Sequence, residues 1–365
     1  MSDDRPVDRV LLRGEDETAL RARAEVLSPD DQVDEYWAIV HELQRRGTRA
    51  CFDWALGLVE ATDGGRRRLG CDVLAQLGYE DGHPFRDRSV ALLLSHLHDA
   101  DVSVVSAAVS AVGHLAEAGP DVPAGAQAAV LALAGHDDAE VRYAVASALP
   151  ALVGLDWVPS GDPAVETLIA LAADPADDVR SWATFGLGAR LKVDGPAVRA
   201  CLRARLGDPN REVAGEALAG LARRHDRSAL DAVAAALGAD DVHRSVVEAA
   251  GWLTDTSLHE PLRRLAAWWD GDRELLAGAV RRCAPEFVRD SAAQVGALVA
   301  AADAVALELT ISSELLGQRP EGPMVQRSPG DRVGYGLEPL LRRAGGSAEV
   351  AAQLIRTDTD RTPRP

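Results

Sequence analysis

The feature of this sequence that most constrains its fold is a segment that recurs along most of the chain. Each copy opens with an acidic turn and continues as an apolar run, as in HDDAEVRYAVASAL from His136 and ADPADDVRSWATFGL from Ala173. The aliphatic residues that open the runs follow one another at intervals of 29 to 38 residues. These anchors are Leu69, Val104, Val141, Val179, Val213, Val246 and Leu275. Units this short cannot each enclose a core, so they must stack in series.

The spacing within each run predicts a helix. Apolar residues fall four and eight positions after the anchor, as in Val141, Val145 and Leu149, which is the stripe of one helix face. A second amphipathic segment precedes each acidic turn, beginning with DEYWAIVHELQRRG at residue 34. The sequence therefore predicts about seven helix pairs in an all-α solenoid.

Aspartates recur five residues before the anchors. They are Asp99, Asp174, Asp208, Asp241 and Asp270. At this distance from the apolar run we expect them to be structural caps, whose carboxylates accept the free N–H groups at the start of the second helix.

The paired helices, with Asp ahead of the second helix and Val-Arg at its start, resemble the HEAT-repeat family, including its bacterial phycobilisome-lyase-type form. Val141-Arg142 and Val179-Arg180 carry the resemblance most clearly, and Asp174 precedes the latter. The resemblance covers about residues 34–302. It implies a right-handed alpha-alpha superhelix in which Asp174, Arg180 and Arg142 form a ladder between repeats. In the other copies the Arg position is held by Gly70, Val105, Ala214, Val247 and Leu276.

Three segments are expected. Residues 1–30 form a flexible N-terminal segment, residues 31–302 form the solenoid, and residues 303–365 form a C-terminal extension with a Gly/Pro-rich linker and a tail. The nine glycines and prolines between Gly317 and Pro339 exclude a regular helix there. Short helices are expected from Leu337 to Arg343 and over 347–356.

The charge is unevenly distributed. Asp and Glu number 57 against 39 Lys and Arg, for a net charge of −18, and the stretch from Ser89 to Val179 holds 13 acids and a single base, Arg142. Such a charge repels nucleic acid and anionic membranes and favours a basic protein partner. Because equivalent turns stack in a solenoid, some of these acids could form an acidic ridge that binds the partner, while the alternative is that they only solvate the turns. The candidate ridge is Asp101, Asp137, Asp138, Glu140, Asp177 and Asp178.

Candidate reactive sites are weak. His96 and His98 are two positions apart, so on a helix they point in different directions, and the four cysteines form no C-x-x-C pair. We therefore expect neither a metal nor a cofactor, and no catalytic residues. Trp182 is expected to pack in the core, since it falls on the apolar stripe that includes Gly186 and Leu187.

The sequence thus predicts a non-catalytic scaffold that binds a partner protein on the solenoid surface, with an immunity or antitoxin protein as a sharper version. Its alternative is a HEAT-like enzyme, similar to alkylpurine DNA glycosylases or bilin lyases, which would gather Trp and a carboxyl of raised pKa on the concave side. The basic residues are all arginine except Lys192, which indicates a GC-rich bacterial source. An acidic N-terminus and no apolar span of membrane length favour the cytoplasm. The oligomeric state stays open.

Overall fold

The computed structural model consists almost entirely of helices. It describes residues 12–29, 32–119, 121–153, 158–304, 309–312, 324–327 and 334–357. The predicted terminal tails therefore lie outside the described residues at positions 1–11 and 358–365. The chain forms two compact units, Met1–Leu155 and Asp156–Pro365.

The first unit contains eight described helices. They are α2 (Glu17–Ala24), α3 (Val33–Arg46), α4 (Arg49–Val59), α5 (Gly64–Leu74), α6 (Arg86–Ser95), α7 (Val102–Glu117), α8 (Ala126–Leu131) and α9 (Ala139–Leu152), with short 3-10 turns at Tyr79–Asp81 and His96–His98. The N-terminal segment thus includes a helix, α2, which packs against α3.

The second unit continues the series. Its helices are α10 (Pro163–Leu171), α11 (Asp177–Phe185), the π-helical turn η3 (Gly186–Arg190), α12 (Pro196–Arg205), α13 (Arg211–Arg223), α14 (Leu230–Leu237), α15 (Arg244–Leu253), α16 (His259–Leu265), α17 (Arg273–Cys283) and α18 (Pro285–Asp303), with 3-10 turns at Arg227–Ala229 and Thr256–Leu258. Helices α19 (Leu337–Arg343) and α20 (Ala348–Thr357) close it, where the sequence predicted two short helices.

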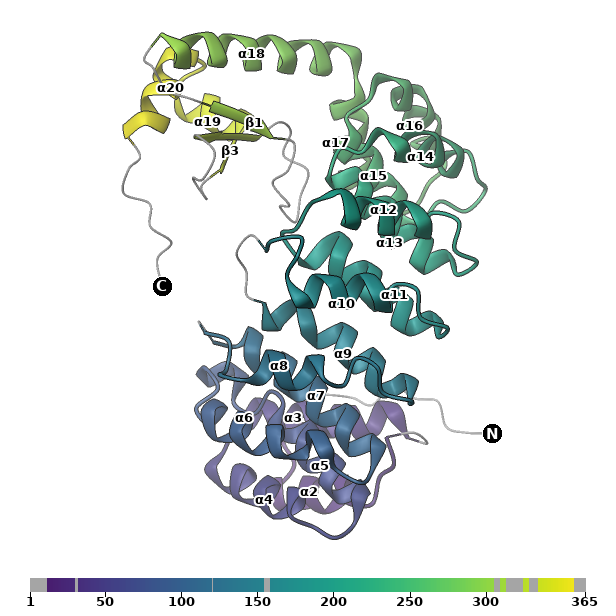
Figure 1. Cartoon of the computed structure of the whole chain (residues 1–365), viewed down its shortest axis with the longest axis vertical. Coiled ribbons are helices and arrows are strands. Elements are labelled where there is room, and N and C mark those ends of the chain that lie inside the picture. The colour runs from purple at the N-terminus through teal and green to yellow at the C-terminus, as the bar shows by residue number, and fades with distance from the viewer. Residues whose placement is uncertain are drawn as a thin grey trace. The chain divides into compact units, whose positions relative to one another are not determined.

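Within the described residues the helices make seven consecutive pairs, from α4–α5 to α16–α17, as the repeat predicted. The second helices of successive pairs pack side by side. In the first unit these are α5, α7 and α9, and in the second unit α11, α13, α15 and α17 (Figure 1). This arrangement buries the predicted stripe, so that Val141, Val145 and Leu149 are fully inaccessible to solvent.

The first pair differs from the prediction. The sequence paired the helix at residues 34–47 with the one around Leu69. In the structure a further helix, α4, lies between these two along the chain, and α4 is the helix that pairs with α5. Gly47 ends α3 in a left-handed conformation, and the Thr48 hydroxyl accepts the Cys51 N–H at 3.0 Å to begin α4. This Gly-Thr junction is a stop and start signal, so α3 is an additional helix ahead of the first pair.

Close helix contact in the second unit depends on two glycines. A Cβ atom built on Gly220 of α13 would lie 2.7 Å from the Cα of Gly188 in η3. Since no larger residue fits without displacing backbone, these glycines set the approach of the two segments. Beside this contact lies Arg224, whose side chain is 1% exposed.

The C-terminal extension contains a small antiparallel sheet that the sequence did not predict. Strands β1 (Leu309–Ser312), β2 (Met324–Arg327) and β3 (Gly334–Gly336) pair in that order, with Leu309 opposite Arg327 and Met324 opposite Gly336. Helix α18 packs against α20 and β1, and α19 packs against β3. Leu298, Leu340 and Ile355 join these helices in a hydrophobic cluster of their own. The residues between the strands lie outside the described ones.

A buried carboxyl lies between α3 and α5. Tyr36 donates to Asp72 Oδ2 at 2.6 Å, and the Gln44 amide donates to the Asp72 carbonyl at 2.7 Å. Arg68 is 4.0 Å from the carboxylate. Burial, opposed by Tyr36 and Arg68, raises the pKa of Asp72 to about 6. The folded protein therefore binds this proton more tightly than the unfolded chain.

This carboxyl should give the protein a pH-dependent stability. Between pH 4 and pH 6 the unfolded chain has lost the Asp72 proton and the folded chain keeps it, so the free energy of unfolding falls as pH rises. A shift of this size corresponds to about 3 kcal/mol. We expect Asp72→Asn to remove the decline, measured by urea melts at pH 4 and pH 7. Asp53→Asn, at an exposed site, is the control, and an unchanged slope in Asp72→Asn would refute the assignment.

Candidate functional site

The acidic turns before the second helices are the surface to which the sequence assigned binding. In the first unit, the Asp138 carboxylate accepts the Glu140 N–H at 2.7 Å and so caps α9. Asp137, Asp138 and Glu140 are all exposed. The structure therefore places three carboxylates of the candidate ridge together on one turn, where they face solvent.

Asp101 has a structural role as well. Its carboxylate caps α7 by accepting the Ser103 N–H at 3.0 Å and the Ser103 hydroxyl at 2.8 Å, and it is half-buried. Asp101 therefore contributes less exposed charge to the ridge than the turn before α9.

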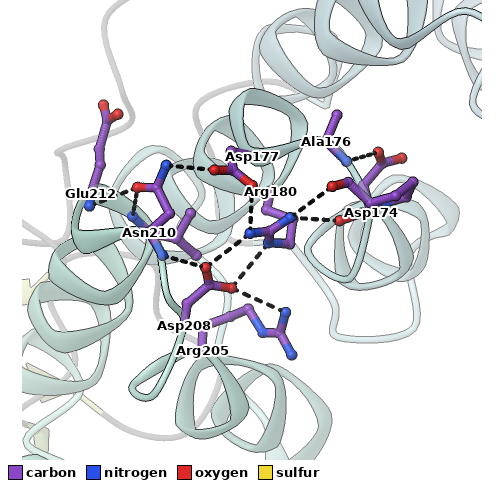
Figure 2. A network of polar contacts seen from close by, with 10 residues as sticks. Asp174, Ala176, Asp177, Arg180, Arg205, Asp208, Asn210 and Glu212 are labelled. Carbon is purple, nitrogen blue, oxygen red and sulfur yellow. Dashed lines mark hydrogen bonds and ion pairs between the residues drawn. The ribbon is translucent and has the colours of Figure 1, made fainter.

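In the second unit the two candidate acids differ from one another. Asp177 Oδ1 accepts from Arg180 Nη2 at 2.8 Å, and Asp177 Oδ2 accepts from the Asn210 amide at 3.2 Å (Figure 2). Asp178, the next residue, is exposed. Asp177 thus links two successive turns, while Asp178 faces solvent.

The cap assignment from the sequence is wrong by two residues. The N-caps of α7, α11, α13, α15 and α17 are Asp101, Ala176, Asn210, His243 and Asp272, and each follows the predicted aspartate by two positions. The residues concerned are Asp99, Asp174, Asp208, Asp241 and Asp270. Three of them, Asp99, Asp174 and Asp208, accept the N–H of the residue two positions later at 2.8 to 3.0 Å. They form the turn that leads into the helix.

The ladder between repeats is present at Arg180. Its Nε donates to Oδ2 and its Nη2 to Oδ1 of Asp208 in the next repeat, both at 3.0 Å, so the two side chains form a bidentate pair (Figure 2). Its Nη1 donates to the carbonyls of Asp174 and Pro175 in its own turn. The guanidinium holds the pKa of Asp208 below its usual range. This pair joins consecutive repeats through a charge-assisted contact.

A second rung was missed by sequence reasoning. Arg67 pairs with Asp99 of the following repeat at 2.7 and 2.8 Å, and it donates to the carbonyls of Ala61 and Thr62. This pairing lowers the pKa of Asp99 to about 2. Arg67 and Arg180 both lie four residues after their N-caps. The sequence alignment of the repeat at Leu69 is therefore three residues too late, and Arg67, not Gly70, is the residue equivalent to Arg180.

Arg142 lies at the same position of α9. Its Nη1 atom donates to the carbonyls of His136 and Asp137, both at 2.8 Å, as Arg180 does in its own turn. The one base of the acidic stretch therefore donates to the backbone of the turn.

The second helices of the second unit display aromatic and acidic side chains. Trp182 of α11 is 37% exposed, so its predicted core position is wrong, and it meets Phe185 edge-on at 5.6 Å. Burial raises the pKa of Glu216 on α13, and Glu212 and Glu248 add to the rise. Raised carboxyl pKa values recur at functional sites.

Other reactive groups are accounted for by packing. Burial raises the pKa of the Cys71 and Cys283 thiols, so they are poor nucleophiles. His96 lies 3.5 Å from Asp99. Among the described residues no group of three or more His, Cys, Asp and Glu side chains is placed to hold a metal. No described helix combines the length and apolar character that crossing a bilayer requires.

Comparisons with known proteins support the repeat. Residues 90–188 match the family described as HEAT repeats. A stretch of 116 residues is 35% identical to protein YibA of Escherichia coli K12 and covers 32% of this chain and 41% of YibA, less than half of that relative. The X-ray structure of E. coli YibA aligns with 75% of this chain and 94% of its own, at 24% identity and a TM-score of 0.58, which shows the fold alone. The complex of CpcE and CpcF of phycocyanin lyase from Nostoc aligns at a TM-score of 0.41, with 15% identity over 65% of this chain and 91% of that one.

Proposed function

We propose, from the premise that residues 90–188 of this chain belong to the HEAT-repeat family, that it is a non-catalytic scaffold for a basic partner protein. The observation that carries the proposal is the turn before α9, where Asp137, Asp138 and Glu140 are exposed together. HEAT repeats commonly bind proteins, and the exposed carboxylates of this turn favour a partner with a basic surface.

The electrostatics of the turns support a steering role. Arg142 donates to the backbone of its turn and Arg180 pairs with Asp208. Both arginines therefore stabilise the repeats. The exposed acids of the ridge then attract a basic surface and speed its encounter. An immunity protein that masks a basic toxin is one case of this function, and it would form a stable complex without turnover.

The enzyme alternative gains one observation, the raised pKa of Glu216 on a helix that packs against the one carrying Trp182. The charges that act on Glu216 are those of Glu212, Glu248 and Arg223. Carboxylates gathered in this way attract a cation, which favours binding of a basic group as the role of this set. We therefore keep binding as the proposed function.

Affinity capture from a lysate of the source organism, at low and at high salt, tests this proposal. We expect a basic protein to be retained at low salt and released at high salt. Replacing four ridge acids, Asp137, Asp138, Asp177 and Asp178, with asparagine should abolish its capture. Asparagine keeps the oxygen that caps α9 and the one that Arg180 contacts, so the fold should survive.

The matched control removes four charges elsewhere. Its substitutions are Asp53→Asn, Asp87→Asn, Glu260→Gln and Glu274→Gln, all at exposed positions. Equal loss in the control would mean that net charge alone attracts the partner. Retention of nucleic acid in place of protein would reject the proposal and favour the enzyme alternative.

A further inference from the structure

One surface of the second unit combines an exposed tryptophan with carboxylates whose charges are only partly compensated. We call it the α11–α15 face and define it by Trp182 and Phe185 of α11, Glu212 and Glu216 of α13, and Glu248 of α15. The three helices pack side by side. Trp182 and Glu216 both lie six residues after their N-caps, so they occupy equivalent positions on neighbouring helices.

The aromatic part of the face is open to solvent. Trp182 exposes 37% of its surface although its neighbours Ser181 and Ala183 are buried. Phe185, one turn later on the same helix, meets it edge-on at 5.6 Å. A large and accessible aromatic ring is a typical anchor for a partner side chain.

The acidic part carries charges crowded together. Glu216 is half-buried, and its pKa is raised first by burial and then by Glu212 and Glu248. Glu248 already has a cation, Arg244, at 3.1 Å, and Arg223 offsets the rise at Glu216 only in part. A second cation that approached Glu216 and Glu212 would relieve this repulsion.

The fold itself shows how such a face holds a guanidinium. The Arg223 guanidinium carbon lies over the Trp252 ring at 5.8 Å, and the charge of Arg223 is coupled to those of Glu248 and Glu216. Trp252 and Phe185 both lie nine residues after their N-caps. The chain thus places one arginine of its own over an aromatic ring and in the electrostatic field of two carboxylates, one repeat away from Trp182.

We propose that the α11–α15 face binds an arginine side chain of an extended basic segment in the partner, stacked on Trp182 and paired with Glu216 and Glu212. This inference rests on the proposed function and names the group that the scaffold recognises. Arginine fits better than lysine, because its planar guanidinium stacks on a ring while it donates to a carboxylate in the same plane. Phosphate-bearing partners are disfavoured by the three glutamates.

Synthetic probes test the proposal without the natural partner. A short fluorescein-labelled peptide that alternates arginine with serine is compared, by anisotropy at one ionic strength, with the same peptide carrying lysine or uncharged citrulline. We expect the arginine peptide to bind about fivefold to tenfold more tightly than the lysine peptide, and the citrulline peptide to bind least. Equal binding of the arginine and lysine peptides would mean bulk charge attraction and would overturn the proposal.

Variants locate the binding. Trp182→Leu and Glu216→Gln should each weaken the arginine peptide about fivefold or more. Trp268→Leu removes a ring that is 52% exposed elsewhere, and Glu260→Gln removes one negative charge at an exposed position outside both proposed surfaces, so both controls should bind as wild type. Circular dichroism confirms that each variant is folded. Unchanged binding by folded Trp182→Leu and Glu216→Gln, or tighter binding of oligothymidine than of the arginine peptide, would reject the site.

The two proposals can fail separately. If the lysate partner is captured through the ridge but the arginine peptide does not bind, the α11–α15 face is not the recognition site and the scaffold function stands. If neither the peptide nor a basic protein binds, the scaffold function itself is wrong.

Discussion

Replacing Arg224 with methionine is expected to lower the free energy of unfolding by about 3 to 5 kcal/mol. The guanidinium is 1% exposed and serves as a buried connector between segments that are distant in sequence. It donates to four backbone carbonyls, those of Leu187, Gly188, Val193 and Gly220, at 2.5 to 3.2 Å. Methionine fills much of the volume but donates nothing, so these carbonyls lose their partner.

The energy comes mainly from unmet polar groups, with a smaller contribution from one lost ion contact. The Leu187 and Gly188 carbonyls belong to the π-helical turn, and Asp194 lies 3.7 Å from Arg224 Nε. Without the arginine, the carbonyls are left in a site that water reaches poorly, and each unsatisfied group costs about 1 to 3 kcal/mol. Asp194 retains Arg199 at 2.5 Å, which limits the loss at that carboxylate.

Chemical denaturation of three variants checks this expectation. Arg224→Lys keeps the charge but concentrates its donors on one nitrogen, so it should recover only part of the loss. Arg227→Met removes an arginine that is 74% exposed and pairs with Asp255 at 2.6 Å, and it should change stability by less than about 1 kcal/mol. If Arg224→Met unfolds with wild-type energetics, water must satisfy the carbonyls and the connector role is wrong.

The apolar periodicity was enough to predict the second helices, because a stripe such as Val141, Val145 and Leu149 can be buried only in a helix that packs against its neighbours. The same logic failed at Trp182. A residue adjacent to the stripe lies at its border, and whether it is covered depends on the neighbouring helices, which the local sequence does not specify. The C-terminal sheet was missed for a related reason, since its short strands are separated by glycine and proline and have no repeating pattern.

The sequence predicted which types of residue make the polar contacts between repeats, but it placed some of them at the wrong positions. Aspartates before the second helices indicated ordered turns. Their carboxylates accept the N–H of the residue two positions later, and that residue is the N-cap of the helix. Arg67 was missed because the alignment took its reference from an aliphatic residue, whereas the ladder depends on distance from the N-cap. Counting from the cap recovers Arg67, Arg142 and Arg180 at one position.

The acidic surface could be predicted from composition and turn position, because charged residues on a turn are solvated almost wherever the fold places them. The α11–α15 face could not. The raised pKa of Glu216 arises from burial, then from Glu212 on the same helix and from Glu248 on the next helix, and both the burial and the contribution of Glu248 depend on how two repeats stack. Sites formed between repeats can therefore be identified only from the structure.

Leu149→Asp is expected to destabilise the first unit by about 4 kcal/mol or more. Leu149 is fully buried in α9, so the substitution loses apolar burial, leaves a cavity and places a carboxylate without a cation in a nonpolar site. Leu149→Ala, which lacks the charge, should lose about 2 to 5 kcal/mol. The difference between the two variants in urea melts reports the charge term, and a Leu149→Asp protein that melts like wild type would contradict the burial of this stripe.

The damage should also spread along the stack. Helix α9 packs extensively against α7 and pairs with α8, and repeats are stabilised chiefly by their nearest neighbours. Hydrogen exchange of Leu149→Asp should therefore show faster exchange in α7 and α8 as well as in α9, while α13 and α15 keep their protection. Uniform loss of protection along the whole chain would indicate that the solenoid unfolds as one cooperative body, and loss confined to α9 would indicate that each helix pair is stable by itself. Either result would contradict stabilisation through neighbouring repeats, because that mechanism requires a disturbance to weaken as it passes from pair to pair.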